Sequence, residues 1–456
     1  MAGWAPLEYL LRKEIIQRTE EGCNTDGFQE RLDASPKDEA SLNQLYDSLM
    51  ALPIEESFPY CEPSDLEEIR RERPELSPLR ATANPSYDSF LGAWLGRCAG
   101  CALGKPVEAG PFMAGKDGIP GWKLVYEWFA GAGAYPIRTY TPGTSSAESV
   151  YGIRANQGRS LRETIQYMET DDDIRYTVLG LIMMEEKGLR WDTWDVGQLW
   201  LSRLPFHLVC TAEKQAYLNL PFGLDRLTPS ATAADKREAL NWVRTYRNPY
   251  REWIGAQIRV DGYAYAAAGN PELAAELAWR DASLSHVKNG IYGAMFCSAM
   301  IAAAFVEKDA EAIIQAGLRQ IPRRCRLTED IHRAMDITAS AQDELDLVSK
   351  IWDAFCKYDP VHTNNNAALC TAALLYAGDD FEKAIATAVL GGWDTDCNGA
   401  TVGSIMGAKL GASNLPDNWI EPLHDTLYSA IPDFHPIAVS ECAKRSFATY
   451  QKLQTV

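Results

Sequence analysis

The sequence predicts an all-α protein, and three features of the chain lead to that prediction. Apolar residues recur at three- and four-residue spacing in several segments, as in residues 381–389, which places them on one face of a helix. Glycines recur at every fourth residue in residues 92–104 and again in residues 399–411. Runs that alternate apolar and polar residues are scarce, and only residues 257–260 resemble a strand.

The first 85 residues differ from the rest and are predicted to form a helical N-terminal extension. Amphipathic stripes at residues 7–16 and 42–52 indicate helices, and a charged run followed by prolines precedes the next segment. Residues 86–456 are predicted to form the main unit. Within that unit, residues 109–160 are rich in glycine, proline and aromatic side chains, which is typical of a long binding loop or a lid.

The two glycine ladders indicate a close contact between two helices. Glycine inside a helix costs about 1 kcal/mol relative to alanine, so a helix with four glycines needs a compensating contact. We expect the two ladders to pack against each other. The end of the first ladder would then bring Glu108 to the start of the second, where Asp394 and Asp396 stand. A packing role alone would explain the glycines but not the carboxylates at their ends.

Two acidic strings, more than two hundred residues apart, are interpreted as parts of one metal site. Residues 169–173 hold three consecutive aspartates, and residues 391–398 hold two more. Adjacent carboxylates repel each other unless solvent or cations neutralise them. Carboxylate and hydroxyl oxygens with no nearby histidine suit Mg²⁺, Mn²⁺ or Ca²⁺ better than Zn²⁺. Taken alone, the three aspartates could instead cap a helix, where negative charge meets the helix dipole.

Composition excludes several classes of partner. With 44 basic and 62 acidic residues the formal net charge is −18, which argues against nucleic acid or an anionic membrane as the main partner. No apolar run is long enough to cross a bilayer. Eleven cysteines without a framework spacing indicate reduced thiols, so we expect a cytoplasmic protein. Cys98 and Cys101 form a single C-x-x-C, for which helix packing is a simpler explanation than zinc or redox chemistry.

Three motifs, in the order in which they occur, resemble the signatures of the ADP-ribosylglycohydrolase family. They are Gly96-x3-Gly100-Cys101-Ala102-Leu103-Gly104-Lys105-Pro106-Val107-Glu108, Thr170-Asp171-Asp172 and Gly392-Trp393-Asp394-Thr395-Asp396. The resemblance extends from about residue 87 to residue 450. It implies a compact orthogonal helical bundle with a centre of two magnesium ions, for which Mn²⁺ is the alternative.

The same resemblance implies a role for each matched residue. The metal ligands would be Thr170, Asp171, Asp172, Asp394 and Asp396. Asp396 would bridge the two ions. The catalytic carboxylates would be Glu108, Asp172 and Asp394, with Glu108 approaching the scissile bond. A ribose diol can replace water on hard cations and so place its C1″ atom beside a general acid or base.

Five further residues are candidate substrate contacts, namely Gly255, Arg259, His286, His362 and Asn365. The glycine and the arginine stand where the resemblance implies a loop for the pyrophosphate of ADP-ribose. The histidine at position 286 lies in a segment similar to the family's substrate-side histidine segment, although a single histidine is more often buried and satisfied. The histidine at position 362 and the asparagine at position 365 precede an Ala- and Leu-rich helix, where such residues also act as caps.

The chain also departs from the family pattern. Cys101, Asp173 and Cys397 stand where the family commonly has aspartate, threonine and threonine, and a thiol is a poor ligand for Mg²⁺. Trp253 and Ile254 occupy the loop where bare backbone would approach a pyrophosphate. We therefore expect ADP-ribose to bind no better than a simpler ribosyl compound.

The sequence predicts a magnesium-dependent hydrolase that cleaves the glycosidic bond at ribose C1″ of an ADP-ribosylated protein or a related N-ribosyl substrate. One alternative keeps the fold and the metals but cleaves a nucleoside-like small molecule. A second is a catalytically silent family member with a binding or structural role, which the intact carboxylates argue against. A prenyl-diphosphate enzyme would need a D-D-x-x-D spacing that residues 171–175 lack.

Overall fold

The computed structural model describes residues 5–75, 79, 81–228 and 230–455, and almost all of their regular structure is helical. Within these residues the only sheet is a short antiparallel pair, β1 (Thr426–Leu427) and β2 (Ile437–Ala438). The all-α prediction is therefore confirmed. Residues 257–260, the one strand-like run, do not form a strand, because they belong to the turn of the 3-10 helix η3 (Ile254–Arg259) and the start of the helix after it.

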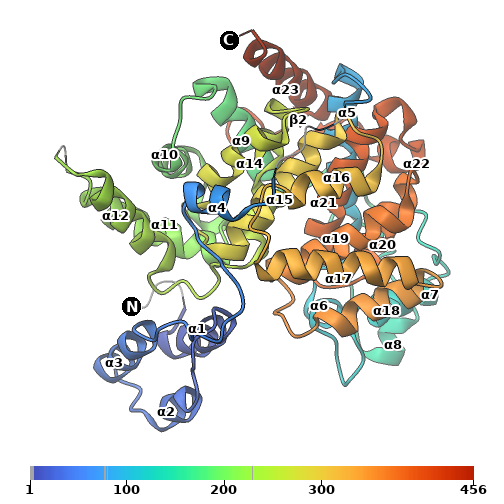
Figure 1. Ribbon diagram of the computed structural model, residues 1–456. Helices are drawn as coiled ribbons and strands as arrows, with labels where there is room; N and C mark the ends of the chain where they lie inside the picture. Colours follow the sequence, from blue (N-terminus) through green and yellow to red (C-terminus); the bar gives the residue numbers. More distant parts are fainter. Residues whose placement is uncertain (1–4, 76–78, 80, 229, 456) are drawn as a thin grey trace.

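Three N-terminal helices form a small group beside the main body, drawn in blue in Figure 1: α1 (Leu7–Glu20), α2 (Phe28–Ala34) and α3 (Glu39–Met50). The next helix, α4 (Leu66–Glu72), lies apart from them against the main body, where Arg70 pairs with Glu276 at 2.7 Å. Leucines of α1 to α3 form their own apolar cluster, which is completed by Ala212 and Tyr250 of the main body. The N-terminal helices are therefore attached to the rest of the molecule through a shared core. The predicted boundary after residue 85 stays a prediction.

Two glycine-rich helices, α5 (Tyr87–Gly104) and α21 (Thr395–Leu410), lie antiparallel at the centre of the main body. A Cβ atom added at Gly100 would lie 1.9 Å from the carbonyl oxygen of Gly399, and one added at Gly96 would lie 2.1 Å from that of Gly403. The expected contact between the two ladders is thus present, and it is a backbone-to-backbone contact along their whole length.

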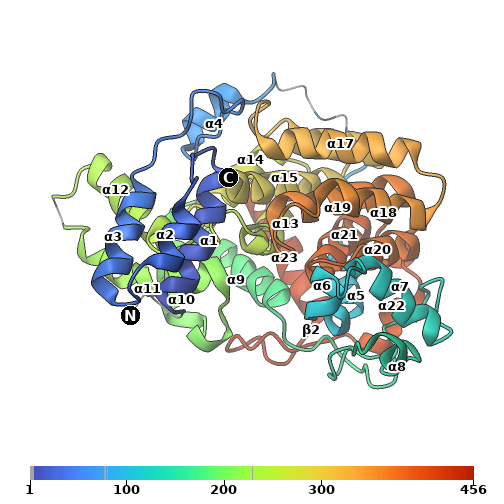
Figure 2. The ribbon, with the colours of Figure 1, turned by 90° about the horizontal axis from the view of Figure 1, so that it is seen from below.

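Other helices surround this central pair, as Figures 1 and 2 show. Those between α5 and α21 are η1 (Lys105–Val107), α6 (Gly110–Ala114), α7 (Gly121–Gly131), α8 (Ala147–Tyr151), α9 (Asp172–Lys187), α10 (Thr193–Arg203), η2 (Phe206–Leu208), α11 (Thr211–Asp225), α12 (Ala233–Thr245), η3, α13 (Asp261–Ala266), α14 (Pro271–Ala282), α15 (Lys288–Ala304), α16 (Ala310–Leu318), α17 (Arg326–Ser340), α18 (Glu344–Phe355), α19 (Thr363–Ala377) and α20 (Phe381–Leu390). After α21 come η4 (Ala412–Asn414), α22 (Asp417–Ile420), η5 (Glu421–Leu423), the two strands and α23 (Val439–Leu453).

Polar side chains begin several of these helices by accepting hydrogen bonds from free backbone N–H groups. Ser86 precedes α5 and accepts from Ser89 N at 3.3 Å, and Asp380 precedes α20 and accepts from Lys383 N at 3.0 Å. None of the helices in the described ranges is long and apolar enough to span a bilayer.

The segment 109–160, predicted to be irregular, contains the short helices α6, α7 and α8. Its aromatic side chains mostly pack inward: Phe112, Trp128 and Phe129 are fully buried. The glycines and prolines of this segment break it into short helices rather than preventing helices altogether. None of its residues, all of which are described, lines the acidic cavity presented below. A lid role for this segment stays a prediction.

Candidate metal centre and active site

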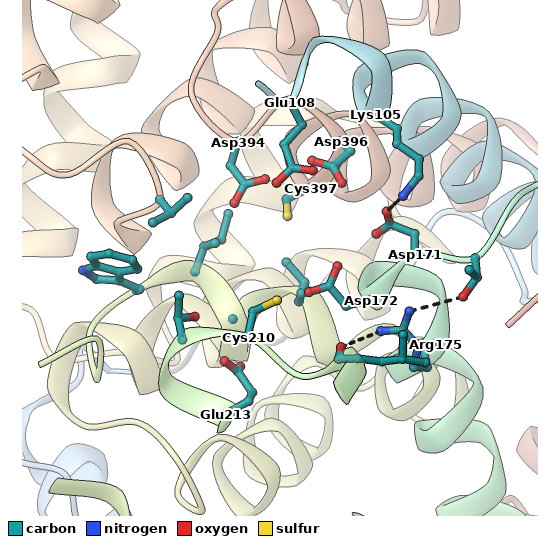
Figure 3. A pocket seen from close by; sticks show the side chains of 18 of the residues that line it. Lys105, Glu108, Asp171, Asp172, Arg175, Cys210, Glu213, Asp394, Asp396 and Cys397 are labelled. Atoms are coloured by element: carbon teal, nitrogen blue, oxygen red, sulfur yellow. Dashed lines mark hydrogen bonds and ion pairs between the residues drawn. The ribbon is translucent and has the colours of Figure 1, made fainter. Parts of the chain in front are cut away.

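A cavity of about 520 Å³ lies where the first turns of α9 and α21 meet the end of η1. Its other walls come from the segment around η2, the start of α11 and the turn at η3. Six carboxylates line it: Glu108, Asp171, Asp172, Glu213, Asp394 and Asp396. Figure 3 shows the side chains of Glu108, Asp394 and Asp396 pointing toward one another. The two acidic strings of the sequence are thus brought together at one site.

The packing of the two glycine helices places Glu108 in this cavity. A Cβ atom at Gly104, the last residue of α5, would lie 2.2 Å from the carbonyl oxygen of Thr395, so the end of α5 touches the start of α21. The Thr395 hydroxyl donates a hydrogen bond to the Gly104 carbonyl oxygen at 2.9 Å. Glu108 follows directly after η1, and its own carbonyl oxygen accepts a hydrogen bond from Asn156 Nδ2 at 2.8 Å.

A tight turn aims Asp394 into the same cavity. Gly392 has a φ of +74° and Trp393 one of +58°, a conformation that is strained for a bulky residue. The Trp393 ring is held there by stacking on Trp352, with 5.0 Å between ring centroids and 13° between planes. Asp394 N donates to Asn366 Oδ1 at 3.3 Å, and α21 begins at the next residue. The turn therefore fixes the direction of the Asp394 carboxylate, directly before α21.

The three consecutive aspartates have three different roles. Asp171 caps α9 by accepting a hydrogen bond from Asp173 N at 3.1 Å, and it also forms an ion pair with Lys105. Asp172 lines the cavity. Asp173 points into the core, where its carboxylate lies 3.0 Å from Nη2 of the fully buried Arg97. The helix-cap interpretation therefore holds for Asp171, but it does not account for its two neighbours.

Burial and the mutual repulsion of neighbouring carboxylates oppose ionisation of most carboxyl groups in this cavity. Burial, together with the Asp394 carboxylate, raises the pKa of Glu108 well above its usual range. Burial and the Glu108 carboxylate do the same to the pKa of Asp396. For Asp172, burial and the adjacent Asp171 raise the pKa to about 7. Asp171 is the exception: burial opposes its ionisation, but Lys105 outweighs burial and lowers its pKa.

The donor atoms fit a divalent cation. Asp394 Oδ1 and Asp396 Oδ1 are buried and have no hydrogen-bond partner among the described residues. Such atoms are costly to bury unless a cation or water satisfies them. Two groups of residues offer ligand atoms that all lie within 4.8 Å of one another. The groups are Asp394, Asp396 and Cys397, and Cys101, Asp171, Asp173 and Asp396. Asp396 belongs to both groups, so it is the carboxylate with the most potential ligand atoms around it.

Comparison with known proteins gives the family. A family model described as ADP-ribosylglycohydrolase matches residues 82–450 of the chain. The chain belongs to the ADP-ribosylglycohydrolase family. The members of this family are glycoside hydrolases, and the family is metal-dependent. The predicted resemblance is therefore confirmed, and so is the prediction of a glycoside hydrolase.

One solved structure similar to this ADP-ribosylglycohydrolase family member is an ADP-ribosylglycohydrolase-related protein complex. The two chains share 21% sequence identity, and the match covers 80% of this chain and 98% of that chain with a TM-score of 0.45. No curated protein matches the chain significantly.

In this family member, two of the predicted substrate contacts lie near the cavity wall. Gly255 lines the cavity, and a Cβ atom there would lie 2.1 Å from Glu213 Oε1, so the glycine is needed for the close approach of that carboxylate. Arg259 lies behind the wall. Its guanidinium contacts Glu213 at 2.6 Å and Asp281 at 2.7 Å, and it is not among the described residues that line the cavity.

The other three predicted substrate contacts are buried outside the cavity lining. His286 Nδ1 lies 2.8 Å from Ser285 Oγ, and burial lowers the pKa of His286 well below its usual range. His362 caps α19, accepting from Asn364 N at 3.1 Å, and burial lowers its pKa to about 3. Asn365 Nδ2 donates to Asp359 O at 3.2 Å. The cap interpretation thus applies to His362, and substrate contact by these three residues stays a prediction.

Several residues that line the cavity were missed at the level of sequence. Arg175 donates to Leu208 O at 3.0 Å and to Thr170 Oγ1 at 3.2 Å, so it links the η2 segment to a predicted metal ligand. One signal was available for Arg175, since it lies three residues after Asp172 and hence on the same face of α9. Cys210 and His207 lie in a connecting segment without periodicity, which gave no signal.

Proposed function

We propose that this ADP-ribosylglycohydrolase family member is a magnesium-dependent hydrolase of the glycosidic bond at ribose C1″ in an ADP-ribosylated protein or a related N-ribosyl substrate, with Mn²⁺ as the alternative ion. The observation that carries the proposal is the meeting of six carboxylates in one cavity of about 520 Å³. Burying like charges in this way is unfavourable unless cations neutralise them. Oxygen donors of this kind suit Mg²⁺.

The proposed metal ligands are Thr170, Asp171, Asp172, Asp394 and Asp396. Bound cations would hold the ribose diol and stabilise negative charge on its oxygens. Lys105 fixes the position of Asp171 through its ion pair, and Arg175 fixes Thr170 through its hydrogen bond. These contacts support the proposal because they hold two ligands in place without a metal.

Glu108 is proposed as the carboxyl that exchanges a proton at the reacting bond, with Asp172 and Asp394 as the other catalytic carboxylates. Its carboxyl group lies among the carboxylates of the cavity rather than in solvent (Figure 3). A carboxyl in such a place can deliver a proton to the leaving group or take one from the attacking water. The remaining predicted substrate contacts, Gly255, Arg259, His286, His362 and Asn365, are proposed to shape the distal half of the substrate site.

A second candidate is hydrolysis of a nucleoside-like N-ribosyl compound, and the charge around Gly255 favours it. The wall behind this glycine is the Glu213 carboxylate, and Arg259 is already paired with Glu213 and Asp281. Arg175, which lines the cavity, already donates to Leu208 O and Thr170 Oγ1. A diphosphate needs converging N–H donors or free cationic groups. A substrate with a neutral or cationic leaving group does not need such donors in the site.

Cytoplasmic activity on these substrates is also part of the proposal. Every one of the eleven cysteines is unpaired, and all of them lie in the described part of the chain. Unpaired thiols in this number are typical of proteins in a reducing compartment.

A panel of ADP-ribosylated proteins and nucleosides, assayed with MgCl₂, tests the proposal. We expect release of ribose or ADP-ribose from at least one substrate. Asp172→Asn should remove this activity, whereas Asp433→Asn, at a side chain that is 85% exposed, should leave it unchanged. Equal activity of the two variants would contradict the assignment of Asp172, and no turnover of any member of the panel would support a silent binding protein instead.

A further inference from the structure

One end of the acidic cavity combines a thiol with two carboxylates. Cys397 lies in the first turn of α21, lines the cavity and is 5% exposed. Its Sγ atom and one oxygen each of Asp394 and Asp396 lie within 4.8 Å of one another. In Figure 3 the Cys397 sulfur lies directly beside the carboxylates of Asp394 and Asp396. Three donor atoms of mixed chemistry therefore face a common point.

The two carboxylates at this end have unsatisfied oxygens that point to a ligand. Asp394 is 4% exposed and Asp396 is 2% exposed, and Oδ1 of each is without a hydrogen-bond partner in the described residues. The Cys397 sulfur is the third potential ligand atom beside these two carboxylates. A cation that binds both carboxylates therefore either binds the sulfur as a thiolate or leaves it close by without coordination.

We propose that Cys397 is a metal ligand together with Asp394 and Asp396, and that this end of the centre selects a borderline divalent ion such as Zn²⁺ or Co²⁺ over Mg²⁺. Thiolate sulfur favours such ions, whereas Mg²⁺ prefers oxygen. Binding breaks the S–H bond, forms a sulfur–metal bond and releases one proton to solvent. The inference rests on the proposed function in one respect only, namely that this cavity holds cations.

The geometry is compatible with one shared ion. Zinc lies about 2.3 Å from a thiolate sulfur and about 2.0–2.2 Å from a carboxylate oxygen, so two of its ligand atoms are at most about 4.5 Å apart. The donor atoms at this end are already within 4.8 Å of one another. The side chains of Thr170 and Asp172, which also line the cavity, offer only oxygen, the donor that Mg²⁺ prefers.

A second buried thiol near the same carboxylates serves as a matched control. Cys101 has its sulfur within 4.8 Å of ligand atoms on Asp171, Asp173 and Asp396, but it is absent from the described lining of the cavity. Of the carboxylates beside it, Asp173 points into the core and is already paired with the buried Arg97. Cys101 is therefore not expected to bind the ion.

Titration of the full chain with Co²⁺ or Cd²⁺, followed by the sulfur-to-metal charge-transfer absorption, tests the proposal. The wild type should develop this absorption, Cys397→Ser should lose it, and Cys101→Ala and Cys210→Ser should retain it. Absence of the band in the wild type, or its persistence in Cys397→Ser, would overturn the assignment. Loss of the band as predicted, combined with no hydrolysis of any ribosyl substrate, would leave the thiol site standing and refute the proposed function instead.

Two further measurements keep the test decisive if Cys397→Ser fails to fold. In calorimetry the ratio of Zn²⁺ to Mg²⁺ affinity should fall about tenfold or more in Cys397→Thr, because a hydroxyl replaces the thiol. In the unaltered protein, Zn²⁺ should slow alkylation of Cys397, read by mass spectrometry, while labelling of the exposed Cys356 is unaffected. An unchanged affinity ratio, or unprotected alkylation of Cys397, would contradict the proposal.

Discussion

Asp172 and Asp173, neighbours at the start of α9, have different surroundings although their side chains are chemically identical. Asp172 faces the cavity, while Asp173 is 0% exposed and paired with Arg97, whose other Nη atom lies 2.9 Å from Asp261. The first is proposed to take part in the chemistry of the site, whereas the second pairs with a buried arginine of the core. A buried arginine between two carboxylates is tolerated only while both partners are present.

Substitution of these two neighbours should therefore separate activity from stability. We expect Asp172→Asn to reduce hydrolysis by about 100-fold or more through loss of a metal ligand, with little change in the free energy of unfolding. Asp173→Ala should lower the free energy of unfolding by about 3–5 kcal/mol, because it leaves buried charge on Arg97 less compensated. Urea unfolding and the hydrolysis assay together measure both effects. Equal losses of stability in the two variants would contradict the division of roles.

The expected dependence of metal binding on pH follows from the pKa of Asp172. In the folded, metal-free protein the pKa of Asp172 is about 7, against 3.8 in an unperturbed chain. The folded state therefore binds more protons than the unfolded state between these values, and this group makes the metal-free protein less stable as pH rises through that window. A cation favours the ionised form. The stabilisation by Mg²⁺ should thus increase with pH.

Thermal unfolding with and without MgCl₂, from about pH 5 to about pH 8, measures this linkage. We expect the shift in unfolding temperature caused by Mg²⁺ to be largest at the upper end of the range. Asp172→Asn cannot ionise at this position and should show a flatter dependence. A shift of constant size in the wild type would contradict the prediction.

At the scale of elements, the contact between α5 and α21 positions the site. The two helices touch through backbone atoms at four successive turns, from Gly92 opposite Gly407 to Gly104 opposite Thr395. Because they run antiparallel, the end of one lies beside the start of the other, which is where Glu108, Asp394 and Asp396 meet. A change in the middle of this contact should be transmitted to the carboxylates at its end.

Gly100→Ala tests the importance of this contact. The added methyl group would lie 1.9 Å from the Gly399 carbonyl oxygen, and backbone on both sides leaves little room to adjust. We expect a loss of about 3 kcal/mol or more in the free energy of unfolding, the upper part of the range for overpacking. Gly110→Ala is the matched control, since a Cβ atom there meets no other atom within 4 Å. Similar unfolding midpoints for the two variants would show that the helices do not need their close approach.

The N-terminal helices are tied to the main body by buried charge. Arg251 lies 2.7 Å from Glu14 and 3.0 Å from Glu21, both on or next to α1. Lys13 of α1 lies 5.4 Å from the ring centroid of Trp253, which lines the cavity. The extension thus supports one wall of the site from behind.

Removal of one of these buried contacts should lower the free energy of unfolding of the whole protein. We expect Glu14→Ala to lower the free energy of unfolding by about 3 kcal/mol or more, because Arg251 would keep only one of its two buried partners. Glu30→Ala, at an exposed position on α2, should change it by less than about 0.5 kcal/mol. A urea midpoint unchanged in Glu14→Ala would mean that the N-terminal helices are not coupled to the main body.

At the scale of the whole molecule, the sequence predicts those features that leave a regular local pattern. The glycine spacing of α5 and α21 predicts their contact, and that contact in turn predicts the meeting of Glu108 with Asp394. Features set by distant parts of the chain leave no such pattern. Asp173 turns to Arg97, and Gly255 accommodates Glu213, only because helices far apart in sequence meet there.

Two predictions about local structure show the same limit. The strand-like alternation at residues 257–260 lies in a 3-10 turn, and there the Arg259 side chain is buried and paired with Glu213 and Asp281. The aromatic residues of the segment 109–160 suggest a binding surface, yet four of the eight are buried and the other four pack partly buried against the core. Burial and long-range ion pairs decide both cases, and neither is visible in a short window of sequence.

The proposed function requires that the carboxylates around Asp396 form a cation centre on which hydrolysis depends. The most direct measurement is turnover of a ribosyl substrate before chelation, in excess chelator, and after MgCl₂ is restored. We predict activity that disappears in chelator and returns with the cation, and no activity under any of these conditions in Asp396→Asn. Full turnover in excess chelator would contradict the proposed cation centre.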